Sequence, residues 1–315
     1  MNSPLRVGVV GVGYLGSIHA GIYARMPEVH LAGVADIEPG TAERIGTLHA
    51  CPYHTDPYAL IDEVDAVSIA VPTSSHCEVA VPYLEAGKHM LMEKPVAPTV
   101  AEAERLVAKA EEVGTVFLVG HLERFNAGIM ALAERVADPR FIEVHRLGTF
   151  VERATDVDVV TDLMIHDIDI VLSLVNSELK YVSAVGSPVL TDHVDIANAR
   201  LEFENGAVAN VTASRVSAKK FRRIRIFSSG GYHALNFIDQ QIDIVRKTSP
   251  EPGQAFPGLA SERLEVASRP PLDAELEHFV SIIETRQKPF VNGQDGIRAL
   301  KVAGLVQRKI QECLI

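Results

Sequence analysis

One apolar segment of the chain, residues 161–175, carries side chains suited to acid–base chemistry. A helix turns roughly 100° per residue, so four of its polar residues would share a stripe only about 60° wide. These residues are Asp162, His166, Asp169 and Ser173. Because a buried carboxylate or imidazole is costly unless paired, the stripe must face either internal hydrogen-bond partners or a cleft. Asp167 lies off the stripe, so we expect it to meet solvent or a neighbouring basic side chain.

The whole chain has the composition of an ordinary globular protein. Its 315 residues suggest two domains sharing a cleft, and 47% of them are hydrophobic and 23% charged. A formal net charge of −11 argues against nucleic acid or an anionic membrane as the main partner. The three cysteines lack metal-ligand spacing, which predicts no metal site and favours a reducing cytoplasm. We expect neither a signal peptide nor a membrane span.

A glycine-rich turn near the start of the chain predicts a dinucleotide site. An apolar strand, residues 5–10, precedes the turn, and a helix over residues 14–25 follows it. This context suits a pyrophosphate, because glycines allow a tight turn and close approach while the helix N-terminus attracts phosphate. The expected cofactor contacts in the turn are Gly11, Gly13, Tyr14, Leu15 and Gly16.

An acidic residue, Asp36, ends the second predicted strand, residues 30–35. It lies about 20 residues beyond the glycines, where the dinucleotide fingerprint places an acid that binds the ribose hydroxyls. A carboxylate there would repel a 2′-phosphate. The sequence therefore predicts NAD as the cofactor in preference to NADP.

Strands and helices continue to alternate up to residue 119, which predicts a doubly wound parallel sheet. Ligands of such sheets bind beyond the carboxyl ends of the strands. Lys94 stands out there, because it directly follows an apolar strand and precedes a proline. The groups at these strand ends are Pro72, Thr73, His76, Glu93, Lys94 and the residues from His121 to Asn126. An ion pair between Lys94 and Glu93 is the alternative without a ligand, and His76 is expected to be a weak cofactor contact.

Capping patterns mark two helices of this half. Ser75 with Glu78, and Thr99 with Glu102, have the spacing of capping boxes. Gly114 should end the second helix, because glycine readily adopts the left-handed conformation of a helix C-terminus.

From residue 141 onward, alternating runs predict a mainly antiparallel sheet. Asn205-Gly206 is a hairpin signal between two of them. We expect the helix over residues 161–175 to cover one face, and Ala197, Ala199 and Val208 to lie on the other, closed by a second subunit in a dimer or tetramer. Residues 249–271 are expected to form a loop. The predicted domains are a nucleotide-binding domain, residues 1–121, and an α+β domain, residues 122–315, whose final helices pack back on the first.

These pieces resemble the glucose–fructose oxidoreductase / inositol dehydrogenase / MocA family over nearly the whole chain. The matching elements are GVGYLG (11–16), Asp36, VPTSSH (71–76), MEKP (92–95), ERFN (123–126) and DLMIHDID (162–169). The resemblance implies a Rossmann domain followed by an open-faced sheet domain. It also implies oxidation or reduction of sugars and polyols with a nicotinamide cofactor.

The resemblance assigns catalytic roles to Lys94, Asp162 and His166. A neutral His166 can take the hydroxyl proton as hydride leaves the carbon, and Asp162 can orient the imidazole. Lys94 can stabilise the developing alkoxide. Which of Lys94 and His166 is the primary base stays open.

Several segments are most similar to a bacterial subgroup that oxidises the 3-hydroxyl of UDP-N-acetylglucosamine for a partner aminotransferase, in lipid A or other surface-glycan synthesis. The expected substrate contacts are Lys94, Arg124, Asn126, Arg153, His166 and Tyr232. Further cations for a UDP group are Arg215, Lys219, Lys220, Arg222 and Arg223. The alternatives are a myo-inositol or aldose dehydrogenase, an NAD-dependent glycosidase and a non-catalytic NADH sensor.

Overall fold

A computed structural model describes residues 3–151, 157–249, 258–267 and 269–313. The chain forms two compact units, and each is made of two separate segments of sequence. The first comprises Met1–Leu122 with Pro270–Leu300, and the second Glu123–Arg269 with Lys301–Ile315. Within the described part of the chain, no helix combines the length and the apolar character needed to cross a bilayer.

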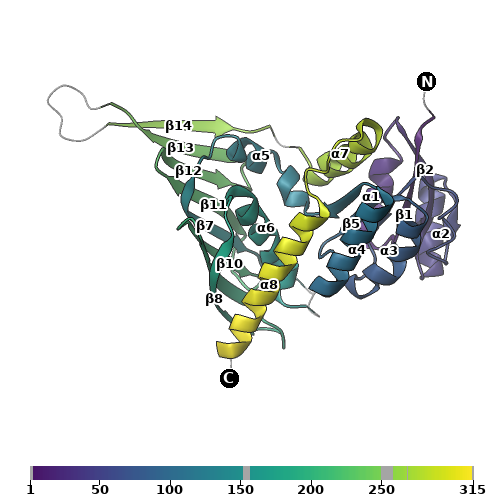
Figure 1. The fold of residues 1–315 in the computed structure, drawn as a ribbon, viewed down its shortest axis with the longest axis horizontal. Coiled ribbons are helices and arrows are strands. Elements are labelled where there is room, and N and C mark those ends of the chain that lie inside the picture. The colour runs from purple at the N-terminus through teal and green to yellow at the C-terminus, as the bar shows by residue number, and fades with distance from the viewer. Residues whose placement is uncertain (1–2, 152–156, 250–257, 268, 314–315) are drawn as a thin grey trace. The chain divides into compact units, whose positions relative to one another are not determined.

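The first unit contains a six-stranded parallel sheet with the order β3-β2-β1-β4-β5-β6. Figure 1 labels β2, β1 and β5 of this sheet. Its strands are β1 (Leu5–Val10), β2 (Val29–Ala35), β3 (Tyr53–His54), β4 (Ala66–Ile69), β5 (His89–Glu93) and β6 (Phe117–Gly120). Strand order reverses between β1 and β4, which makes a ligand site at their carboxyl ends the expectation for this fold. The predicted doubly wound sheet is confirmed. The short β3 was not predicted, because two residues carry no periodic signal.

The helices of the first unit are α1 (Tyr14–Tyr23), α2 (Pro39–His49), α3 (His76–Glu85), α4 (Val100–Val113) and α7 (Pro271–Thr285). A final helix, α8 (Gly293–Cys313), begins in this unit and ends in the second.

The predicted cap of α4 is confirmed, but the predicted cap of α3 is wrong. The Thr99 hydroxyl accepts a hydrogen bond from the Glu102 backbone N–H at 3.2 Å, and Gly114 ends α4 with a φ of 71°. Ser75 precedes α3 but makes no side-chain cap bond. It belongs to a 3₁₀ turn, η1 (Thr73–Ser75), so its backbone is already helical and cannot take the extended cap conformation.

The second unit contains an eight-stranded sheet with the order β14-β13-β12-β11-β7-β10-β9-β8. Its strands are β7 (Pro139–Leu147), β8 (Leu179–Ser187), β9 (Ile196–Phe203), β10 (Val208–Ser214), β11 (Phe221–Ser228), β12 (Gly231–Asn236), β13 (Gln241–Lys247) and β14 (Leu259–Glu265). Neighbouring strands run antiparallel, except that β7 and β10 run parallel to each other. The predicted mainly antiparallel sheet is therefore confirmed. Gly206 takes a φ of 82° in the predicted β9–β10 hairpin.

Two expectations about this sheet are wrong. Residues 249–271 contain β14, which pairs with β13, so the segment is not simply a loop. The strand was missed because its sequence, LASERLE, is mostly exposed and shows little apolar alternation. Ala197 and Ala199 are 1% and 0% exposed, and they share the core face with Val144 rather than the open face. Only Val208 of the predicted group lies on the open face.

One face of the eight-stranded sheet is covered by helices (Figure 1). They include α5 (Ala127–Ala133), which contacts β12 and β13, and α6 (Ile165–Leu174), which contacts β7 and β10. The C-terminal part of α8 lies against β8, where the Cys313 thiol is 3.9 Å from the Ala184 carbonyl oxygen. A short 3₁₀ helix, η2 (Leu122–Phe125), precedes α5, and a π-helix, η3 (Val160–Met164), leads into α6. This layer contains η3, which carries Asp162, and α6, which carries His166.

Candidate active site

The glycine turn after β1 lines a cavity of about 780 Å³ in the first unit. A Cβ on Gly16 would lie 1.8 Å from the Gly11 carbonyl oxygen, so only glycine lets α1 pack this closely on the turn. A Cβ on Gly13 would meet no described atom within 4 Å, so the backbone there is open to a ligand. This arrangement fits the pyrophosphate of a dinucleotide at the N-terminus of α1.

The Asp36 carboxylate is held in place at the end of β2. It accepts the Val12 N–H on Oδ2 at 2.9 Å and the Glu38 N–H on Oδ1 at 3.0 Å. Each carboxylate oxygen retains a second lone pair, which a ribose hydroxyl can use. Asp36 and Glu38 both line the cavity, and together they disfavour a 2′-phosphate. The cavity therefore fits NAD.

The other predicted cofactor contacts divide into two groups. Pro72 lines the cavity. His76 is 1% exposed, and its Nε2 lies 3.0 Å from the Val71 carbonyl oxygen. Burial lowers the pKa of His76, so the neutral ring braces this loop instead of lining the cavity. The remaining predicted contacts outside the lining of this cavity are Tyr14, Leu15, Gly16, Thr73, Glu93 and Lys94.

Some cavity residues were missed by sequence reasoning. They include Ile37, Glu38, Pro57, Tyr58, Ser75 and Glu78. Ile37 and Glu38 directly follow Asp36, so their chain position was an available signal. Pro57 and Tyr58 follow the two-residue β3, for which the sequence offers no periodic pattern.

Glu93 ends β5 with its carboxylate buried within the first unit. It is 5% exposed, and Oε1 lies 3.2 Å from His19 Nε2 on α1. Its Oε2 accepts the backbone N–H of Lys94 at 3.3 Å. Glu93 thus braces the turn that carries the half-buried Lys94.

A second buried acid lies near Glu93. Glu275 on α7 is fully buried, and burial together with the charge of Glu93 raises the pKa of Glu275 well above its usual value.

In the second unit, the predicted acid–imidazole stripe begins in a π-helix. Asp162 lies in η3 and is half-buried, whereas His166 lies in the first turn of α6 and is 9% exposed. A π-helix has i→i+5 hydrogen bonds, so the uniform 100° turn assumed for the stripe does not hold from Asp162 to His166. π-Helices are frequent at functional sites. Further along, Asp169 is buried, while Ser173 is exposed and its hydroxyl donates to the Ile170 carbonyl at 2.7 Å.

Asp167 is 1% exposed, and of the two expected surroundings, solvent or a basic side chain, the structure has the basic side chain. Arg146 on β7 donates to it from Nε at 2.8 Å and from Nη2 at 2.7 Å. The same guanidinium donates from Nη1 to Glu123 at 2.7 Å. Burial raises the pKa of Asp167, but this two-pronged geometry is that of an ionised carboxylate with an arginine.

The predicted substrate contacts of the second unit have different surroundings. Arg124 lies 3.6 Å from Asp169, next to the helix that carries His166. Asn126 caps α5, and its side-chain oxygen accepts the Gly128 N–H at 2.9 Å. Arg153 lies outside the described residues.

Tyr232 lies on the open face of the sheet, opposite the face that α6 covers. It pairs with Phe227 across β11 and β12, and Phe227 lies opposite Phe141 on β7. The neighbouring residues on the other side of β7 include Arg146, which binds α6. Within this chain, Tyr232 therefore lies on the sheet face opposite the one that α6 covers.

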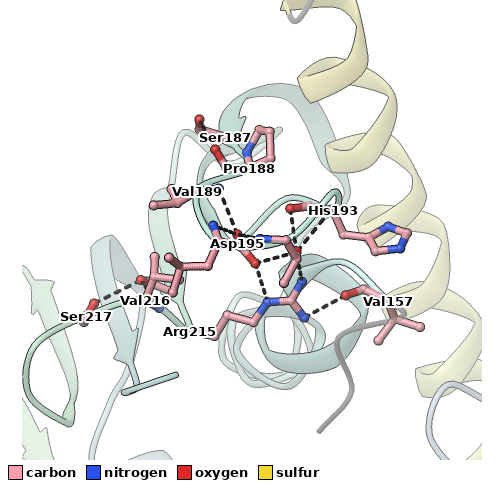
Figure 2. Close-up of polar contacts among 12 residues, drawn as sticks. Val157, Ser187, Pro188, Val189, His193, Asp195, Arg215, Val216 and Ser217 are labelled. Carbon is pink, nitrogen blue, oxygen red and sulfur yellow. Dashed lines mark hydrogen bonds and ion pairs between the residues drawn. The ribbon is translucent and has the colours of Figure 1, made fainter. Parts of the chain in front are cut away.

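Arg215 is buried in a structural ion pair, so it is not available to a UDP group. It is 5% exposed, with Nε 2.7 Å from Asp195 Oδ1 and Nη1 2.7 Å from the Val157 carbonyl oxygen. Figure 2 shows these contacts. Burial would raise the pKa of Asp195, but hydrogen bonds hold it well below its usual range; the donors are the backbone of Thr191, Val189 and Leu190 and the side chain of Arg215. The pair thus anchors the segment that leads into η3.

The other predicted cations are also distributed over the unit. Arg222 donates to Glu123 at 3.2 Å, and Arg223 donates to the Tyr232 hydroxyl at 3.1 Å. Lys219 and Lys220 are exposed between β10 and β11.

Comparisons with known proteins agree with this geometry. Residues 5–121 match the profile of an oxidoreductase family with an NAD-binding Rossmann fold, and residues 131–233 match the GFO/IDH/MocA C-terminal domain. UDP-N-acetylglucosamine 3-dehydrogenase of Acidithiobacillus ferrooxidans is 38% identical over 98% of both chains. A solved structure of that enzyme matches with a TM-score of 0.92 over 99% of both chains, at 37% identity. Myo-inositol 2-dehydrogenase of Thermotoga maritima is 25% identical over 98% of this chain and 97% of that one.

Proposed function

Because the chain belongs to the GFO/IDH/MocA family of NAD-binding oxidoreductases, we propose that it oxidises the 3-hydroxyl of UDP-N-acetylglucosamine. The product would be a 3-keto nucleotide sugar, which an aminotransferase can consume. The full-length similarity to a UDP-N-acetylglucosamine 3-dehydrogenase carries this choice of substrate. Inositol dehydrogenases are the second candidate, supported by lower identity over a similar length.

The proposed mechanism divides the work among Lys94, Asp162 and His166. Gly11, Gly13 and Asp36 would hold NAD, which would supply the hydride acceptor for oxidation of the carbinol carbon. His166 takes the hydroxyl proton, because an imidazole nitrogen can act as a general base. Asp162 orients the imidazole and stabilises the imidazolium, and Lys94 stabilises the developing alkoxide. Lys94 is the alternative first proton acceptor.

A substrate panel tests the proposal. The protein is incubated with NAD and, in separate reactions, UDP-N-acetylglucosamine, its uronic acid, UDP-glucose and myo-inositol. An aminotransferase and glutamate remove the keto product, and NADH formation is followed by its absorbance at a wavelength of about 340 nm. We expect turnover on UDP-N-acetylglucosamine to exceed that on the other three. Turnover on myo-inositol alone would reject the nucleotide-sugar assignment, while leaving the family and the cofactor unchanged.

A further inference from the structure

One buried guanidinium in the second unit joins two segments that precede and follow it in the sequence. Arg146 is 4% exposed and projects from β7 toward the helix-covered face. It contacts Glu123 at 2.7 Å on one side and Asp167 at 2.7 and 2.8 Å on the other. Glu123 is 6% and Asp167 1% exposed, so the three charges are largely removed from water.

Each carboxylate is next to a residue of the candidate site. Asp167 directly follows His166 in α6, and Glu123 directly precedes Arg124 in η2. Arg124 in turn lies 3.6 Å from Asp169, one helical turn beyond His166. Two charged contacts therefore connect η2 with α6. Arg146 bridges Glu123 and Asp167, and Arg124 contacts Asp169 directly.

The charges of this network nearly balance. Arg222 donates to the same Glu123 oxygen at 3.2 Å, so two guanidiniums face two carboxylates. Burial raises the pKa of Glu123, but Arg146 and Arg222 outweigh it, and the net pKa is lowered. A balanced buried network of this kind contributes little net stability compared with apolar side chains of the same volume, whereas removing one member leaves a costly unpaired charge. Such a network can instead fix the relative orientation of the elements that its members belong to.

We infer that Arg146 is a positioning residue, which fixes the rotation of α6 through Asp167 and thereby the direction of the His166 imidazole. A bidentate pair defines direction as well as distance, because both nitrogens and both oxygens must align. Small displacements of a catalytic group can lower turnover by about 10²-fold. This inference rests on the proposed function of His166.

Four variants of the network, one of them Arg146→Met, separate positioning from stability. Asp167→Asn keeps the size of the side chain but weakens one arm of the network. Arg146→Lys keeps the positive charge but loses the pair of guanidinium nitrogens that donate to Asp167. The triple variant Glu123→Leu, Arg146→Met and Asp167→Leu replaces the buried charges by apolar side chains, so it should regain melting temperature relative to Arg146→Met alone. Ile244→Ala, in the buried part of β13, is the control for simple loss of stability.

We expect the triple variant to recover thermal stability while kcat on UDP-N-acetylglucosamine stays about 10²-fold below wild type. The KM for NAD should not change, because the cofactor cavity lies in the first unit. Asp167→Asn should lower kcat more than Ile244→Ala does, even where the two variants lose the same amount of melting temperature. A triple variant with wild-type kcat would overturn the inference.

Hydrogen–deuterium exchange provides a test that does not depend on activity. Amides of residues 160–174 should exchange faster in Arg146→Lys and in the triple variant than in wild type, whereas Ile244→Ala should leave them unchanged. Unchanged exchange in all variants would reject the positioning role. If wild type turns over no substrate of the panel, the proposed function fails, and this exchange pattern alone decides whether Arg146 holds α6.

Discussion

At the scale of single residues, the proposed chemistry depends on one imidazole and one ammonium group. His166→Ala and Lys94→Ala should each lower turnover by about 10²-fold or more, because each removes a group that handles the proton or the developing charge. Steady-state kinetics on the best panel substrate measures this. The matched controls are His193→Ala and Lys88→Ala, which remove the same side-chain types elsewhere in each unit. Near wild-type rates in both test variants would reject the assignment.

Cofactor choice depends on two acidic residues of the cavity, Asp36 and Glu38. Asp36→Ser should raise kcat/KM for NADP relative to NAD by on the order of tenfold, because it removes a carboxylate from the ribose end of the cavity. Glu38 remains there, so the change should fall short of a full reversal. The control is Asp62→Ser, an exposed acid outside the cavity lining. An unaltered ratio would mean that Asp36 does not face the 2′-position.

At the scale of secondary-structure elements, the first unit was largely predictable from sequence. Glycines, an acid about 20 residues later and apolar strands are local signals, and they placed β1, α1 and β2 correctly. The surroundings of Asp167 could not be predicted in the same way. Its partner Arg146 lies on a strand 21 residues earlier, and no spacing rule connects the two. Likewise, the π-helix at η3 shares its apolar pattern with an α-helix, so periodicity alone could not distinguish them.

Helix α7 contributes a buried acid whose titration should make stability depend on pH. Glu275 is 0% exposed, and neither carboxylate oxygen has a hydrogen-bond partner among the described residues. Burial and the charge of Glu93 raise the pKa of Glu275 in the folded state. Above the unfolded pKa of about 4.3, the unfolded chain releases this proton while the folded chain keeps it. The free energy of unfolding should therefore fall as pH rises toward the folded-state pKa.

Glu275→Gln should remove this part of the pH dependence. Urea unfolding between about pH 5 and 8 should show wild type losing up to about 1.4 kcal/mol per pH unit from this group, and the variant gaining stability relative to wild type as pH rises. Glu284→Gln, on an exposed part of the same helix, is the control and should leave the slope unchanged. Parallel curves for wild type and Glu275→Gln would contradict a protonated Glu275.

At the scale of the whole molecule, the open face of the eight-stranded sheet carries exposed apolar side chains. Phe227 is 37% exposed, with its ring centroid 5.8 Å from that of Phe141 and 4.9 Å from that of Tyr232. Tyr181 and Val185 lie on the same face at β8 and are 54% and 59% exposed. A sheet with one face covered by helices and the other bearing aromatic residues is suited to association through that second face.

We therefore expect a homodimer or homotetramer that buries this face at micromolar concentration. Phe227→Glu places a charge within the aromatic group, so it should shift the protein toward monomer in sedimentation velocity while leaving the NAD cavity of the first unit intact. Leu48→Glu, on α2 of the first unit and 68% exposed, is the control for adding a charge at an exposed apolar position. A wild-type protein that sediments only as monomer would refute association through the sheet. If Phe227→Glu and Leu48→Glu dissociate the protein equally, the interface must involve more than this face, because Leu48 belongs to the other unit.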